Sequence, residues 1–145
     1  MNELEKLQEH INNLTTNDWD KLISLLQEIE NTRNFGELKE GEQLEDGSIT
    51  FPYWSSSEVV DKAFKLIHEL NLVPAFDWTS WEEGKAILNN PNFNYSILDT
   101  ITLCKLLTTI VRSDRFDDGF FASNFENGVI PQIIKTIIQN EINIS

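Results

Sequence analysis

The chain is poor in cysteine, in basic residues and in long apolar runs. Its one cysteine, Cys104, cannot form an intrachain disulfide, so the fold must be held together by noncovalent packing. No apolar run approaches the roughly 20 residues that a membrane helix needs. The acidic beginning of the chain does not resemble a secretory signal. These absences predict a cytoplasmic location and no association with a membrane.

Lysine and arginine number only 11 against 24 carboxylates, which gives a formal net charge of −13. A surface of this sign repels phosphate backbones, so direct nucleic-acid binding is disfavoured. An acidic surface suits a basic protein partner, or it imitates nucleic acid toward a protein that binds nucleic acid. Solubility alone is the plainest reason for such a charge.

Residues that serve nucleophilic or metal chemistry are also scarce. Cys104 stands among leucines in an apolar segment, where a thiol is inert. His10 and His68 fall on different predicted helices without a cysteine or second histidine at ligand spacing, so no metal site is predicted. The sequence has no phosphate-binding glycine loop and no serine elbow, and it indicates no cofactor.

Helical periodicity accounts for most of the sequence. Its 145 residues, of which 40% are hydrophobic, suit a single domain of mainly α class, a compact bundle of six or seven helices. Residues 3–32 are expected to form an antiparallel helical hairpin, and residues 58–142 the helical core. The segment 97–111 is predicted to be the central helix, because so wide an apolar arc has to be surrounded by other elements.

The helical periodicity stops in residues 34–57, which contain three of the six glycines. Asp46-Gly47 is a signal for a hairpin with a two-residue loop, and the residues after it alternate between apolar and polar side chains. A small β-hairpin or extended excursion is therefore predicted near 42–53. Pro52 would restrict it to the edge of a sheet.

Aromatic residues concentrate in the connections between predicted helices, among them Trp78 and Trp81. Aromatics in such places line a pocket for a planar ligand or anchor a protein partner. More often they close the top of a core. Gly84, one turn into its predicted helix, indicates that a backbone or an aromatic ring packs closely there.

Residues 112–118 form a second candidate site, because two of the three arginines in the chain stand here, three residues apart. Arginine recognises carboxylates and phosphates with two parallel hydrogen bonds. Arg112 and Arg115, with Asp114 orienting a guanidinium and Phe116 beside them, could therefore bind an anion. Alternatively, Arg112 only complements the C-terminal dipole of its helix.

The aspartates of this segment are a weaker candidate for a metal site. Asp114, Asp117 and Asp118 lack the spacing of a calcium loop, and Arg115 lies between them. Asp117 is expected instead to cap the helix that follows, with Gly128 just beyond the end of that helix.

Several uncommon residues recur at fixed spacing in the second half of the chain: Phe76-Asp77-Trp78, Trp81-x-x-Gly84, Arg112-x-Asp114-Arg115-Phe116-x-x-Gly119 and Phe125-Glu126-x-Gly128-x-Ile130. With these motifs the chain resembles, over about residues 51–138, an uncharacterised bacterial domain family without an assigned activity. The resemblance implies a domain boundary and no mechanism. It leaves the first helical hairpin outside.

The sequence thus favours a non-enzymatic protein-binding module with an aromatic-rich surface, for which the candidate binding residues are Trp78, Trp81, Arg112, Asp114, Arg115 and Phe116. An enzyme or a small anionic-ligand site at residues 112–118 is the alternative, and an acidic nucleic-acid mimic is the second. Convergence of Trp78, Trp81 and Arg112 on a concave pocket would favour the ligand site. Carboxylates of residues 37–46 at phosphate-like spacing would favour the mimic.

Overall fold

The computed structural model describes residues 2–39, 41, 43–49, 53–117 and 119–142. The mainly α class predicted from the periodicity is confirmed in this part of the chain. None of the described helices is both long and apolar enough to span a membrane. In chain order the elements are α1 Glu3–Asn12, α2 Thr16–Glu30, β1 Gly36–Lys39, β2 Tyr53–Ser56, α3 Glu58–Glu69, the 3-10 helix η1 Trp78–Ser80, α4 Glu82–Leu88, the 3-10 helix η2 Tyr95–Ile97, α5 Thr100–Ser113, α6 Phe120–Glu126 and α7 Val129–Ile142.

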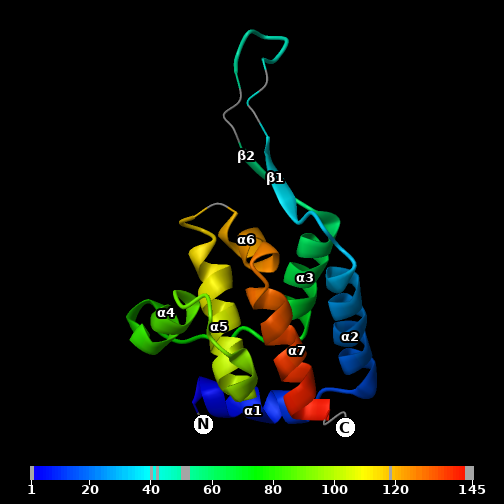
Figure 1. Cartoon of the computed structure of the whole chain (residues 1–145), viewed down its shortest axis with the longest axis vertical. Helices are drawn as coiled ribbons and strands as arrows, with labels where there is room; N and C mark the ends of the chain where they lie inside the picture. Colours follow the sequence, from blue (N-terminus) through cyan, green and yellow to red (C-terminus); the bar gives the residue numbers. More distant parts are fainter. Residues whose placement is uncertain (1, 40, 42, 50–52, 118, 143–145) are drawn as a thin grey trace.

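The core is centred on α5 and α7, which pack against each other (Figure 1). The other helices surround this pair: α1, α4 and α6 contact α5, while α2 and α6 contact α7. The apolar segment predicted to be the central helix does occupy that position. The buried side chains of the two helices include Leu103, Leu106, Leu107 and Ile110 of α5 and Ile130, Ile133, Ile134, Ile137 and Ile138 of α7.

α5 begins later than the apolar run suggested. Asp99 caps it, because its Oδ1 accepts a hydrogen bond from the backbone N of Thr102 at 2.8 Å. Ile97 therefore lies outside α5, and 72% of its surface is exposed. Within the helix, the buried hydroxyls of Thr108 and Thr109 donate to the backbone carbonyls four residues earlier, at 2.9 and 3.0 Å. These bonds allow polar side chains in an otherwise apolar position.

The first two helices do not form the antiparallel pair expected over residues 3–32. α1 crosses the lower end of the bundle and contacts α5, whereas α2 runs upward beside α3 and α7 (Figure 1). Leu7 and Ile11 of α1 are buried at this lower end. The apolar face of α1 thus closes the bottom of the core instead of covering the side of α2.

A β-hairpin projects beyond the helices (Figure 1). β1 pairs with β2 in antiparallel register, from Gly36 opposite Ser56 to Lys39 opposite Tyr53. An isolated bridge joins Gln43 to Ile49 closer to the tip. A hairpin was predicted near 42–53, and its strands extend beyond both of these limits. The prediction for Pro52 lies outside the described residues.

The turn of the hairpin falls at Asp46-Gly47 as predicted, but the loop has three residues instead of two. The backbone N of Leu44 donates to the carbonyl of Ser48 at 2.7 Å, and the N of Gly47 donates to the carbonyl of Leu44 at 2.9 Å. Gly47 has a φ of 89°, which glycine adopts without strain. A left-handed residue closing a tight turn is typical of three-residue hairpin loops.

Leu107→Ala is expected to lower the free energy of unfolding by about 2–5 kcal/mol, because the truncation leaves a cavity in a fully buried part of α5. Chemical denaturation of the parent and the variant measures the difference. The exposed Ile97 is the control position, and Ile97→Ala should change stability by less than about 0.5 kcal/mol. An equally small effect of Leu107→Ala would show that α5 is not central.

Cys104 should react slowly with a thiol reagent as long as the protein is folded. Its side chain is fully buried, and this burial raises the pKa of the thiol to about 12, so almost no reactive thiolate is present at neutral pH. Labelling with a chromogenic disulfide should become rapid only in denaturant. Rapid labelling of the folded protein would contradict the buried position of Cys104.

Candidate functional site

Trp81, one of the predicted site residues, lies on the α4 side of the bundle and packs against other side chains. Phe76 stands edge-on to it, with the ring centroids 5.6 Å apart. Lys105 of α5 places its Nζ 4.3 Å from the Trp81 centroid and 5.1 Å from the Phe76 centroid. The two rings therefore bind a cation that the chain itself supplies. We call Phe76, Trp81 and Lys105 the aromatic–lysine cluster.

Gly84 provides the space in which the ring of Trp81 lies. A Cβ atom on Gly84 would stand 2.2 Å from Cε3 of Trp81, far inside van der Waals contact. The prediction that an aromatic ring packs on this glycine is confirmed. Trp78, the neighbouring predicted residue, is half-buried in η1, and η1 also contacts α5. Both tryptophans thus lie where the chain around α4 packs onto α5.

Asp114 caps α6, the role that the sequence assigned to Asp117. Its Oδ1 accepts a hydrogen bond from the backbone N of Phe121 at 2.9 Å, which satisfies one of the free N–H groups at the beginning of the helix. Asp117 contributes only its backbone carbonyl, which accepts from the N of Phe120 at 3.0 Å. Gly119, with a φ of 86°, turns the chain between the two aspartates and α6.

The two arginines lie at the connection between α5 and α6, at the end of the bundle nearest the hairpin (Figure 1). Arg112 is half-buried and Arg115 is exposed. Neither forms an ion pair with the described carboxylates of this connection or of α6, and Asp118 lies outside the described residues. Arg112 stands two turns beyond Lys105, about 10 Å further along α5. Arg112 and Lys105 therefore lie on the same helix, whereas Arg115 follows its end.

A hollow of about 150 Å³ opens beside Asp114, between α3 and the start of α6. Two aromatic rings line it, Phe64 and Phe121, which stand edge-on with centroids 5.7 Å apart. The carboxylates of Asp61 and Asp114 also line it. The hollow thus joins one predicted residue to α3 residues that the sequence did not indicate. Its two negative charges suit a cation better than the anion expected near the arginines.

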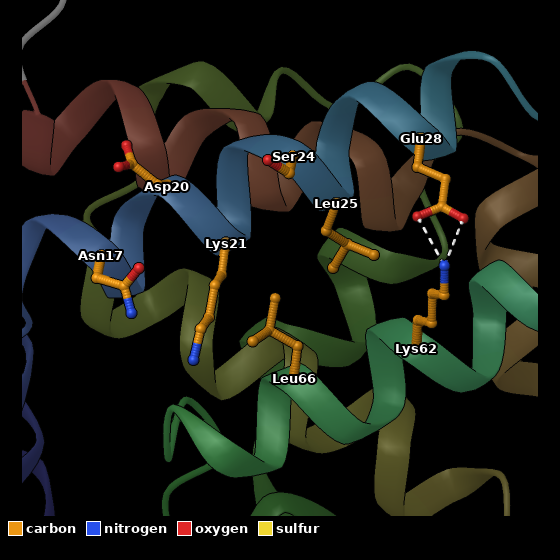
Figure 2. Close-up of a pocket in the computed structure, with 8 residues that line it drawn as sticks. All are labelled: Asn17, Asp20, Lys21, Ser24, Leu25, Glu28, Lys62 and Leu66. Atoms are coloured by element: carbon orange, nitrogen blue, oxygen red, sulfur yellow. Dashed lines mark hydrogen bonds and ion pairs between the residues drawn. The ribbon is translucent and has the colours of Figure 1, made fainter.

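A larger, shallow groove of about 420 Å³ runs between α2 and α3. Figure 2 shows Leu25 and Leu66 facing each other across it and Lys21 extending from α2 toward α3. Lys62 closes one end of the groove, with its Nζ 3.1 Å from Oε1 of Glu28. The hydrogen bond from Lys62 to Glu28 raises the pKa of that lysine, so it stays protonated and cannot act as a base.

Nothing in the sequence indicated this groove, because charged residues at helical spacing are typical of any exposed helix face. Its charged lining residues are two acids and two lysines: Asp20, Glu28, Lys21 and Lys62. The groove therefore has no net charge with which to select a charged ligand.

The side chains most often used in catalysis have structural partners. Nε2 of His10 lies 2.6 Å from the carbonyl oxygen of Leu70, and Nδ1 of His68 lies 2.7 Å from that of Phe64. Each histidine thus uses one ring nitrogen to hold a backbone group. Within the described ranges, no group of three or more His, Cys, Asp or Glu is placed to hold a metal ion.

Most of the large exposed apolar side chains of the described residues lie on the hairpin or on elements at the end of the bundle from which it projects (Figure 1). Leu44 and Ile49 flank the hairpin turn and are 45% and 72% exposed, while Phe64 of α3 is 43% exposed and Phe116 is 83% exposed. The remaining large exposed apolar residue of the described chain is Ile97, the last residue of η2, which lies at the other end. We call Leu44, Ile49, Phe64 and Phe116 the hairpin-end surface.

Of the hairpin-end surface, the sequence had indicated only Phe116 as a site residue. A signal for Leu44 and Ile49 was present, since both stand within three residues of the Asp46-Gly47 turn. An apolar side chain so close to a hairpin tip has no core within reach. No comparable signal marked Phe64, which follows the apolar periodicity of α3.

The model of a family of unknown function (DUF6508) matches residues 14–141. The chain belongs to this family. The match includes α2, so the expectation that the first two helices lie outside the family was wrong for α2. Neither curated proteins nor solved structures gave a match. Because the DUF6508 family has no known function, the role of the chain has to be argued from its own surfaces.

Gly84→Ala should destabilise the protein by about 1–3 kcal/mol, because the new methyl group displaces the ring of Trp81. In an ordinary helix the same change would stabilise by about 1 kcal/mol, through the better helix propensity of alanine. Removing the ring should therefore reverse the sign, so that Gly84→Ala stabilises a Trp81→Ala background. Urea denaturation of the four proteins measures this coupling. A stabilising Gly84→Ala in both backgrounds would mean that Trp81 does not pack on α4.

Proposed function

We propose that this member of the DUF6508 family is a single, non-enzymatic protein-binding domain whose partner docks on the hairpin-end surface. The observation that carries the proposal is that four of the five large exposed apolar side chains of the described residues lie on the hairpin or on elements at the end of the bundle from which it projects (Figure 1). Gathered exposed apolar groups mark interaction sites more often than isolated ones do. The hairpin presents two of them, Leu44 and Ile49, well away from the bundle, where a partner can enclose them (Figure 1).

The predicted site residues of the α5–α6 connection support the same surface. Arg112, Asp114 and Arg115 are sequence neighbours of Phe116, the most exposed member of the hairpin-end surface. Arginine and aromatic residues are enriched among those that dominate binding energy at interfaces. In this proposal the arginines supply directional hydrogen bonds around an apolar centre. Trp78 and Trp81 stay a second candidate surface, on the α4 side.

A small-ligand site is the less favoured function, because the hollow nearest the arginines is lined by Asp61 and Asp114, which repel an anion. The spacing of the carboxylates in residues 37–46 would bear on nucleic-acid mimicry, but part of that segment lies outside the described residues. The proposal retains the expected cytoplasmic location and the absence of direct nucleic-acid binding. The first rests on the single cysteine and the lack of long apolar runs, and the second rests on the net charge of −13.

Ile49→Ser is expected to reduce the capture of the native partner about tenfold while leaving the fold intact, because it removes an apolar contact that packs only in the complex. Ile97→Ser is a matched control, since Ile97 is also an isoleucine that is 72% exposed but lies away from the hairpin. Affinity purification from the native host, quantified by mass spectrometry, compares the two variants with the parent. Circular dichroism and thermal melting verify that both are folded.

A shortened variant tests the whole hairpin. Replacing residues 37–55 by an Asn-Gly turn keeps Gly36 and Ser56, which are paired at the base, and leaves the helices unchanged. This variant should melt as the parent does and lose the partner. If it and Ile49→Ser capture the same proteins as Ile97→Ser, the hairpin end is not the binding surface and the proposal fails.

A further inference from the structure

The charge of the projecting hairpin indicates what kind of partner it meets. Residues 36–56 contain five carboxylates and one lysine, a net charge of −4 over 21 positions. In the sequence the carboxylates all fall between Glu37 and Asp46. The segment therefore combines exposed apolar side chains with a high density of negative charge along its sequence. A partner that covers the apolar side chains therefore has to tolerate or neutralise the negative charge.

The tip of the hairpin is ordered by its own hydrogen bonds. Oδ1 of Asp46 accepts from the backbone N of Ser48 at 2.9 Å and from its Oγ at 2.6 Å. The bonds from Ser48 lower the pKa of Asp46, so its carboxylate remains charged throughout the neutral range. Together with the backbone bonds between Leu44 and Ser48, they hold the loop in one conformation. A tip that is ordered before binding loses little conformational entropy in a complex.

The hairpin stands alone in solvent with only two strands. A two-stranded hairpin has marginal stability in water and gains from a third element that packs on it. At its base it is tied to the bundle by the hydrogen bond from the N of Ser57 to the carbonyl of Phe35, at 3.1 Å, and Phe35 is buried against Phe125. The base is therefore anchored, while Leu44 and Ile49 at the tip stay 45% and 72% exposed.

Charge decides among the surfaces that could cover the tip. A second copy of this chain would place one hairpin of charge −4 against another, within two molecules of charge −13 each. Nucleic acid and anionic lipid headgroups carry the same sign and are repelled likewise. A basic protein surface instead gains attraction to the carboxylates and speeds the encounter.

We propose that the hairpin of residues 36–56 docks on a basic surface of another protein, with Leu44 and Ile49 as apolar anchors and the carboxylates of the tip paired with lysines or arginines of the partner. This inference rests on the proposed function and adds the class of the partner. Glu45, exposed beside the turn, is the tip carboxylate on which the contact is best tested, because Asp46 also has a structural role in the loop.

The first experiment identifies the partner by photo-crosslinking from a chosen position of the chain. A photo-crosslinking residue is introduced as Leu44→p-benzoylphenylalanine at the tip and, as a control, as Ile97→p-benzoylphenylalanine away from the hairpin, and both proteins are irradiated in the native host. The tip variant should form one main adduct that the control does not form. An adduct between two copies of this chain, or equal adducts at both positions, would overturn the inference.

The captured protein is then purified and titrated with the parent, with Glu45→Lys and with Glu69→Lys. Glu69 is also exposed but ends α3, so the two substitutions change the net charge equally at different places. Glu45→Lys should raise the Kd about fivefold and weaken its dependence on salt, because it reverses a charge at the contact. Glu69→Lys should leave the Kd within about twofold of the parent, since the position only contributes to the overall field.

Equal effects of the two charge reversals on the Kd, or tighter binding by Glu45→Lys, would overturn the inference that the partner presents a basic surface. This failure is distinguishable from that of the proposed function. If Ile49→Ser and the shortened hairpin abolish capture while Glu45→Lys behaves as Glu69→Lys does, the hairpin binds a protein but does not select it by charge. If none of these variants affects capture, both proposals are wrong.

Discussion

The burial of α5 on nearly every side is the constraint on which the rest of the structure depends. Nine of its 14 residues are buried, so no single neighbouring helix can cover it. α7 covers one side with its isoleucines, and α4, α6 and α1 close the others. Hydrophobic burial at this scale outweighs every other favourable term in a domain of this size. The orientation of α1 follows from it, because Leu7 and Ile11 find apolar surface only at the end of the bundle.

The hairpin projects from the bundle because its residues contribute little apolar surface to this core. Residues 36–49 contain three glycines and five carboxylates, and burying either would cost free energy without an apolar gain. The chain therefore leaves the bundle after Phe35, the last buried residue of this region, and returns at Ser57. α5 ends close to the same place. The helices that cover the core end at this side of the molecule, and Phe64 and Phe116 are exposed there.

The sequence was sufficient for features that are local or periodic. The isoleucines of α7, the central position of α5 and the turn at Asp46-Gly47 all follow from spacing within a few residues. It was not sufficient where two residues are candidates for the same role, or where residues distant in the sequence come into contact. Asp114 and Asp117 are equally good caps by residue type, and only the path of the chain through Gly119 decides between them. The contact of Lys105 with Trp81 joins residues 24 positions apart, which no periodicity reveals.

The candidate site shows the same limit in its aromatic residues. Trp81 and Phe116 both stand in connections, so residue type and position in the sequence treat them alike. In the structure they differ by what lies around them. Trp81 packs on Gly84, and Lys105 already lies over its ring face, whereas Phe116 is 83% exposed. A ring that already binds a cation of its own chain gains less from a partner than one whose surface is still in water. The free energy available for binding is therefore greater at the hairpin end than at the tryptophans.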